Sequence, residues 1–153
     1  MAGMEYDVRS ITVAECPTAV VAAATTWERF PAEWGAMLDQ VWAFLRNTDR
    51  DLGVPDGRNV MLYLDDVPHV EIGVEVTRIF EPSGRVVPSV LPAGTVAMTV
   101  HRGSYDGLAA AHKAVLDWCA ARDLEVARTR WEVYGHMRDA AAEPETTICW
   151  LLA

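Results

Sequence analysis

Glu132 and Tyr134 are the residues of this sequence whose types and spacing could do chemistry. They lie two positions apart in the stretch TRWEVYGHM, residues 129 to 137. Side chains alternate between the two faces of a strand, so in a strand these two would share one face. Trp131 and Val133 would lie on the opposite, mostly apolar face, which we expect to pack on a helix. A carboxylate beside a phenol can attract a cation, or it can deprotonate water while the phenol donates to a developing oxyanion.

The elements expected to position this face occur in two similar halves of the chain. The halves meet at the stretch FEPSGRVVPSVLPAG, residues 80 to 94, which is rich in Pro and Gly. Each half contains a strand-like run, a run with helical spacing and two further strand-like runs. In the first half these runs are residues 18–27, 32–47, 58–66 and 69–80, and in the second half they are residues 94–103, 104–123, 129–137 and 146–152.

Equivalent residues recur at nearly constant distances between the halves, which indicates a duplication. Three alignments give offsets of 71 to 76 residues: Trp42 with Trp118, Tyr63 with Tyr134, and Pro17 with Pro92. A single unit would leave one sheet face bare, so two units must share a core. We therefore predict an α+β fold built from a duplicated β-α-β-β unit with pseudo-twofold symmetry. Its antiparallel sheet of eight strands carries both helices on one side and has a central ligand cleft.

The offset of 71 also aligns Met61 with Glu132, so four side chains are predicted to face one shared cleft. They are Met61, Tyr63, Glu132 and Tyr134. We expect residues 1–153 to form a single domain, with repeat one at about 4–80 and repeat two at about 86–153. The alternative interpretation is that the acid is solvated on an open sheet face and the tyrosines are half-buried packing residues.

Other candidates for the cleft are tryptophans and histidines. Trp27 ends the first predicted strand and Trp34 opens the first predicted helix, so either could offer a ring face to a cation or a flat ligand. Trp150, on the last predicted strand, is a further candidate. His101 and His136 are near the cleft by strand position, where one could act as an auxiliary acid or base. The remaining tryptophans on helix stripes or apolar strand faces are interpreted as core: Trp42, Trp118 and Trp131.

Composition and spacing argue against several classes of function. The formal net charge is −9, and 13 basic residues are outnumbered by 22 acidic ones, which disfavours direct nucleic-acid binding. The longest apolar run, AVVAAA, is too short to cross a membrane, and the N-terminus has no secretory pattern. The three cysteines and four histidines lack metal-type spacing, and no nucleotide or dinucleotide fingerprint is present. We expect a cytoplasmic monomer or weak dimer with no metal and no cofactor.

The second half of the sequence resembles the GyrI-like (gyrase-inhibitor-like) domains, which are the effector-binding domains of AraC- and MerR-type regulators. HRGSYDGLAAAHKAVLDW is similar to their segment h-x-G-x-Y-x-x-L…W, and Glu132-Val133-Tyr134 matches their Glu-x-Tyr. In the first half LYLDD followed by EIGVEV resembles the family's Tyr-bearing strand and the acid-rich strand after it, so the resemblance runs from about Tyr6 to Leu152. It implies a duplicated β-α-β-β fold and an aromatic cleft, in which the Glu attracts lipophilic cations. The sequence departs from the family in two ways: no helical pair stands outside the repeats to form a helix-turn-helix, and the loop HMRDAAAEPETT is alanine-rich.

This resemblance leaves three functions open. The first is a stand-alone binder of lipophilic, aromatic or cationic small molecules, of the kind associated with multidrug binding and antibiotic resistance. The second is a hydrolase that opens the cyclopropane of DNA-alkylating natural products, as some stand-alone members do, with Glu132 as the base and Tyr63 or Tyr134 as the donor. The third is a protein-interaction module like the gyrase inhibitor, which would not use Glu132.

Overall fold

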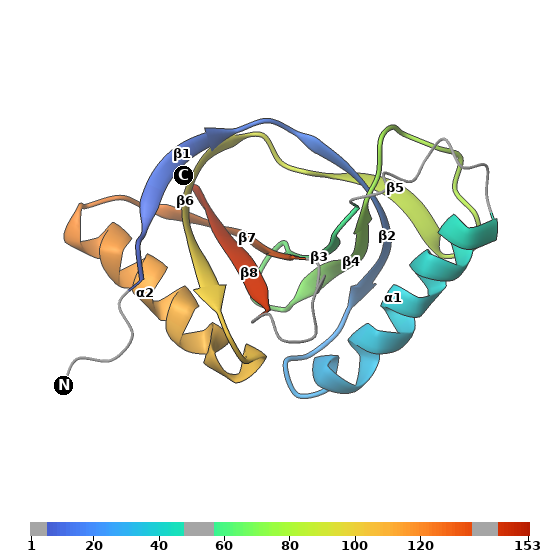
Figure 1. Ribbon diagram of the computed structural model, residues 1–153, viewed down its shortest axis with the longest axis horizontal. Coiled ribbons are helices and arrows are strands. Elements are labelled where there is room, and N and C mark those ends of the chain that lie inside the picture. The colour runs from blue at the N-terminus through green and yellow to red at the C-terminus, as the bar shows by residue number, and fades with distance from the viewer. Residues whose placement is uncertain (1–5, 48–56, 136–143) are drawn as a thin grey trace.

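The fold is an α+β arrangement in which one sheet of eight antiparallel strands carries two α-helices (Figure 1). The computed structural model describes residues 6–47, 57–135 and 144–153. The strands are β1 (Arg9–Val13), β2 (Cys16–Ala24), β3 (Asn59–Tyr63), β4 (His69–Glu75), β5 (Val86–Leu91), β6 (Gly94–Arg102), β7 (Val126–Tyr134) and β8 (Glu145–Leu152). The helices are α1 (Phe30–Asn47) and α2 (Leu108–Ala121), and a 3-10 turn at Tyr105–Gly107 precedes α2. No helix within the described ranges is long and apolar enough to cross a membrane.

The strand order confirms the predicted duplication. It runs β1-β6-β8-β7-β3-β4-β2-β5, which reads as two equivalent halves meeting between β7 and β3. The unit has one strand more than the predicted β-α-β-β, because β1 and β5 each open a half. Each of these two strands pairs with the other half, β1 with β6 and β5 with β2. The two halves are therefore joined at the outer edges of the sheet as well as at its centre.

The strand β5 was not predicted because it lies inside the Pro- and Gly-rich stretch that divides the halves. Its position at the edge of the sheet explains why it tolerates Pro88, since an edge residue can lack a ladder N–H without leaving a neighbour unpaired. The alignment of Pro17 with Pro92 is wrong, because Pro17 lies within β2 and Pro92 lies between β5 and β6.

The central strands β3 and β7 place the predicted cleft residues in register. Met61 pairs with Glu132, Tyr63 pairs with Arg130, and Asn59 pairs with Tyr134. The two tyrosines therefore lie at equal distances on either side of the central Met61–Glu132 pair, as a twofold relationship requires. Side chains two residues apart on a strand share a face, so Glu132 and Tyr134 share one, as predicted.

Both helices pack on the face of the sheet that carries Glu132. On one side of it, α1 buries Met37 and Val41 in a cluster that includes Ile72 of β4. On the other side, α2 buries Val115 in a cluster that includes Ile148 of β8. Figure 1 shows the two helices at opposite ends of this face, with the central strands between them. The prediction that both helices lie on one side is confirmed.

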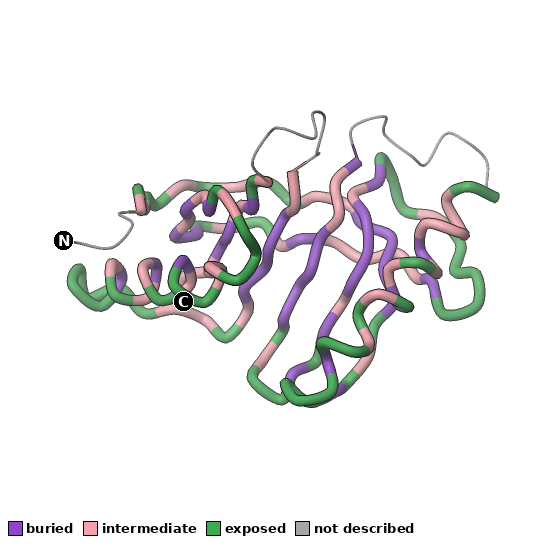
Figure 2. Tube along the Cα trace, turned by 60° about the horizontal axis from the view of Figure 1, so that its bottom comes forward, coloured by how far each residue is buried: buried purple, intermediate pink, exposed green. Residues whose placement is uncertain are grey.

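The opposite face of the sheet encloses a separate core. Trp131 and Val133 of β7 are buried there against Leu91 of the edge strand β5 and Val96 of β6, the strand next to the other edge. In Figure 1 the chain through β1 and β2, and again through β5 and β6, arches over the central strands. Our prediction that the Trp131 face packs on a helix is wrong, because the curled sheet covers this face itself. Figure 2 shows the buried residues concentrated along the central strands.

Candidate functional site

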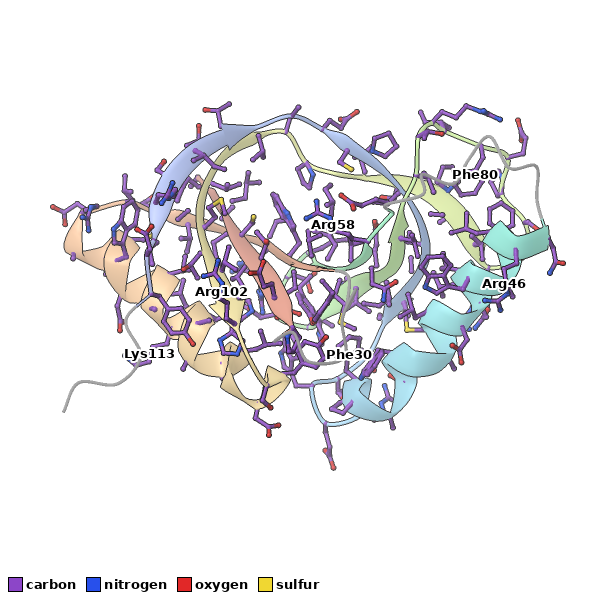
Figure 3. All side chains as sticks on the ribbon, viewed as in Figure 1. Phe30, Arg46, Arg58, Phe80, Arg102 and Lys113 are labelled. Atoms are coloured by element: carbon purple, nitrogen blue, oxygen red, sulfur yellow. The ribbon has the colours of Figure 1, made fainter. Side chains whose placement is uncertain are left out.

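A cavity of about 560 Å³ lies in front of the central strands and beside α1. Most of its lining is aromatic or aliphatic, and it comes from α1, β3, β7 and the start of α2. Phe30 lies at the N-terminal end of α1 beside the central strands, as Figure 3 shows, and Trp34 and Leu38 extend the same wall. Met61 and Tyr134 form the floor, so the cavity has the apolar character of small-molecule sites with few polar contacts.

Glu132 is the acidic residue in the lining of this cavity, and it is 5% exposed. Its Oε1 accepts hydrogen bonds from the hydroxyl of Tyr134 at 2.6 Å and from the hydroxyl of Tyr63 at 3.1 Å. Its Oε2 lies 2.7 Å from Nε2 of His112 on α2. A carboxylate offers about four acceptor positions, so three protein donors leave about one for a ligand.

The neighbouring Trp150 fixes the tautomer of His112. The indole Nε1–H of Trp150 donates to Nδ1 of His112 at 3.0 Å. An indole nitrogen can only donate, so Nδ1 must keep its lone pair and the ring proton must be on Nε2. In this arrangement the imidazole is neutral and donates to Glu132 without cancelling its charge. The three partners of the carboxylate are therefore all neutral donors.

The neighbouring side chains keep Glu132 ionised in spite of its burial. Burial acts to raise the pKa of Glu132, but the hydrogen bond from His112, the electrostatic attraction to His112 and the hydrogen bonds from Tyr134 and Tyr63 outweigh burial and leave the pKa below its ordinary value. Burial raises the pKa of the Tyr63 and Tyr134 phenols, and the charge of Glu132 raises it further. Both phenols therefore remain donors, and the site holds a negative charge near neutral pH.

The nearest basic residue on the strand is directed to another acid. Arg130, two residues before Glu132, pairs its Nη1 with Oδ1 of Asp66 at 2.8 Å. Within the part of the chain that the structure describes, no Lys or Arg side chain pairs with Glu132. A buried carboxylate without a cationic partner is suited to a ligand that supplies the positive charge.

A second cavity of about 490 Å³ lies on the other side of Glu132. It shares Tyr63, Leu108 and Glu132 with the first cavity, so these residues form the boundary between the two. Its own lining includes Trp27 and Trp150, together with the buried side chain of Arg130. Glu132 thus lines both halves of a divided cleft.

The structure brings together seven of the nine side chains that the sequence suggested for the site. Five line the first cavity: Met61, Tyr63, Glu132, Tyr134 and Trp34. Trp27 and Trp150 line the second cavity. His101 lines neither of them. It is buried beneath the start of α2, where its ring nitrogens lie within hydrogen-bonding distance of the Tyr6 hydroxyl and the Ser104 carbonyl. His136 and most of the alanine-rich loop lie outside the described residues.

His112 and Trp42 are among the residues of the site that sequence reasoning missed. His112 was considered only as a possible metal ligand, although it lies four residues after Leu108 and three before Val115, on the apolar stripe of the predicted helix that faces the sheet. Trp42 was interpreted as core, but it lines the first cavity and donates its indole N–H to Oδ1 of Asn59 at 2.9 Å. Helical spacing shows which side chains face the sheet, but it does not show which of them reach a cavity.

Comparisons with known proteins agree with this description. Residues 62–153 match the family model of the GyrI-like small molecule binding domain. The C-terminal domain of EcmrR has a similar structure, with a TM-score of 0.80, 18% identity, and coverage of 98% of this chain and 99% of that chain. The structure of SAV2435 bound to tetraphenylphosphonium has a TM-score of 0.66 and 14% identity, and the match covers 98% of this chain and 94% of that chain. A hydrolase encoded by lin2189 from Listeria innocua has a TM-score of 0.60 and 9% identity, and the match covers 95% of this chain and 91% of that chain. No curated protein matches the chain.

Proposed function

The chain belongs to the family of GyrI-like small molecule binding domains, and we propose that it binds aromatic, lipophilic cations in the cleft around Glu132. The observation that carries this proposal is the buried Glu132 carboxylate, which has three neutral donors and no cationic partner among the described side chains. A cationic ligand would complete the site electrostatically. The neighbouring rings would supply contact area for its apolar groups.

The magnitudes favour a cation over a neutral ligand of the same shape. A charge-assisted hydrogen bond contributes about 1.5–3 kcal/mol, compared with about 0.5–1.5 kcal/mol for a neutral one. Ring faces add about 0.5–2 kcal/mol for each well-placed cation–π contact. The lining offers the rings of Trp42 and Tyr105 in addition to those of the two tyrosines at Glu132.

The similar structure of SAV2435 supports this ligand class, because that protein is bound to tetraphenylphosphonium, a lipophilic aromatic cation. At 14% identity the two proteins share a fold, and the ligand class proposed for this chain follows from its own residues.

The geometry favours binding over hydrolysis at Glu132. A general base works best when its pKa is near the operating pH. The pKa of Glu132 is instead below its ordinary value, and three donors already occupy its oxygens. These contacts lower its basicity and hold it as a fixed negative charge. The Listeria innocua hydrolase is 9% identical to this chain in sequence, so the similarity between the two proteins is one of fold alone.

Isothermal titration with a matched pair of ligands tests the proposal. Methyltriphenylphosphonium carries a positive charge, and triphenylphosphine oxide is a neutral compound with the same three phenyl rings and an oxygen in place of the methyl group. We expect the protein to bind the cation at least about tenfold more tightly, the factor that corresponds to about 1.4 kcal/mol. Equal affinities would contradict the proposal.

A further inference from the structure

Arg130 is a buried cation in the second cavity that the proposed function does not use. It lies on β7 two residues before Glu132 and on the same face, so the two Cα atoms are about 7 Å apart. The residue is 9% exposed and lines the second cavity together with Glu132. A buried guanidinium needs partners for its donors, because an unpaired buried charge is costly.

Only one edge of the Arg130 guanidinium has partners. Nη1 donates to Oδ1 of Asp66 at 2.8 Å and to the carbonyl oxygen of Arg128 at 3.0 Å, which uses both of its hydrogens. Nε and Nη2 donate to no described group. Among the described residues, Oγ1 of Thr146 is the only fully buried side-chain nitrogen or oxygen without a partner. Nε and Nη2 are therefore not enclosed by protein, and Arg130 lines the second cavity, so a ligand there can reach this free edge.

The same protein shows what this edge of an arginine binds. Arg58 donates through Nε to Oε1 of Glu75 at 2.9 Å and through Nη2 to Oε2 at 3.1 Å. This is the two-pronged geometry that matches the two oxygens of a carboxylate. In Arg130 the equivalent pair of donors is left without an acceptor.

Aromatic rings surround the Arg130 guanidinium. Its Cζ lies 5.0 Å from the ring centre of Trp150, 5.4 Å from that of Trp27 and 5.7 Å from that of Tyr63. These rings limit water around the guanidinium and would strengthen its interaction with an anion. Besides Arg130 and Glu132, the charged side chains in this lining are Lys113 and Asp117. They form an ion pair with each other at 2.6 Å.

We propose that the second cavity binds a carboxylate of the ligand through the free edge of Arg130. The cleft would then take a zwitterionic aromatic compound, with its carboxylate on Arg130 and its cationic part beside Glu132. The Glu132 half of this inference rests on the proposed function. The Arg130 half rests on the unused pair of donors in an aromatic cavity.

A purely structural role for Arg130 is the competing explanation. Its contact with Asp66, which lies between β3 and β4, could serve only to hold that connection. Asp66 is exposed, so Asp66→Asn removes this ion pair without altering the cavity. If Arg130 were only an anchor, Arg130→Gln and Asp66→Asn would have similar effects on ligand binding.

Two dyes that differ in one group provide the test. Rhodamine B carries a cationic xanthylium and a free carboxylate, and its ethyl ester keeps the cation and masks the acid. Fluorescence anisotropy gives the affinity of each dye for the wild type, Arg130→Gln, Asp66→Asn and Glu132→Gln, with thermal melting to show that each variant is folded. If Arg130→Gln does not fold, Arg130→Lys keeps the charge and removes the two-pronged edge.

We expect the wild type to bind the acid more tightly than the ester. Arg130→Gln should lower the affinity for the acid by about ten- to a hundredfold and leave the affinity for the ester within about twofold of the wild type. Arg130→Lys should lower the affinity for the acid by a smaller factor. Asp66→Asn should not lower the affinity for the acid. Three results would overturn the inference: Arg130→Gln loses affinity for both dyes equally, Arg130→Gln loses affinity for neither dye, or Asp66→Asn loses affinity for the acid alone as Arg130→Gln does.

The ester separately tests the function on which the inference rests. If Glu132→Gln weakens the ester but Arg130→Gln does not discriminate between the dyes, the proposed function stands and the Arg130 subsite is wrong. If the wild type binds neither dye, both are wrong.

Discussion

Met61 and Glu132 face each other across β3 and β7, at the point where the two equivalent halves of the sheet meet. The hydroxyls of Tyr63 and Tyr134 lie on either side of this pair. Each is 3.5 Å from the Met61 sulfur, and each donates to Oε1 of Glu132. The duplication therefore supplies a symmetric pair of phenols, and the single carboxylate breaks the symmetry. That one charge is the basis of the function proposed for the cleft.

Glu132 should stabilise the fold above its unfolded pKa and lose this effect in acid. Its pKa in the folded protein is below the ordinary value of 4.5, so the folded state favours the ionised form. The stability difference between the wild type and Glu132→Gln should thus be constant near neutral pH and shift against the wild type as pH falls below about 4.5. Urea unfolding from pH 7 to pH 3 measures it. A shift in favour of the wild type in acid would show that the pKa is raised instead.

The sequence was sufficient to predict the duplicated fold and the central residues of the site. The repeated aromatic spacing indicated the twofold relationship, and the period of two placed Glu132 and Tyr134 on one face. The pattern could not show what covers each face, so Trp131 was assigned to a helix rather than to the curled sheet. His112 and Arg130 could not be assigned either. Their roles depend on how α2 docks on the sheet and on contacts with Trp150 and Asp66.

Two glycines should respond in opposite ways to alanine. A Cβ on Gly73 of β4 would lie 1.7 Å from the carbonyl oxygen of Ala19, so β2 and β4 would have to separate. We expect Gly73→Ala to lower the free energy of unfolding by about 3 kcal/mol or more. A Cβ on Gly35 in α1 meets nothing within 4 Å, so Gly35→Ala should raise stability by about 0.5–1 kcal/mol. Urea unfolding of both variants checks this, and similar effects at the two sites would contradict it.

Trp34→Ala should weaken charged and neutral ligands equally. Trp34 lines the first cavity, is 39% exposed, and forms no hydrogen bond with Glu132 among the described residues. Losing about 40–80 Å² of apolar contact corresponds to about 1–2 kcal/mol, or a factor of about 5 to 30 in affinity. Titration of both phosphorus compounds measures the loss. A loss confined to the cation would mean that the ring acts through its charge distribution rather than its area.

The measurement that tests the central claim most directly is the ratio of affinities for methyltriphenylphosphonium and triphenylphosphine oxide, in the wild type and in Glu132→Gln. The variant keeps the size of the side chain and removes its charge. We predict that the ratio falls about ten- to a hundredfold in Glu132→Gln because the cation alone binds more weakly. The affinity for the neutral compound should stay within about twofold of that of the wild type. An unchanged ratio in a folded variant would show that the buried carboxylate does not select the charge of the ligand.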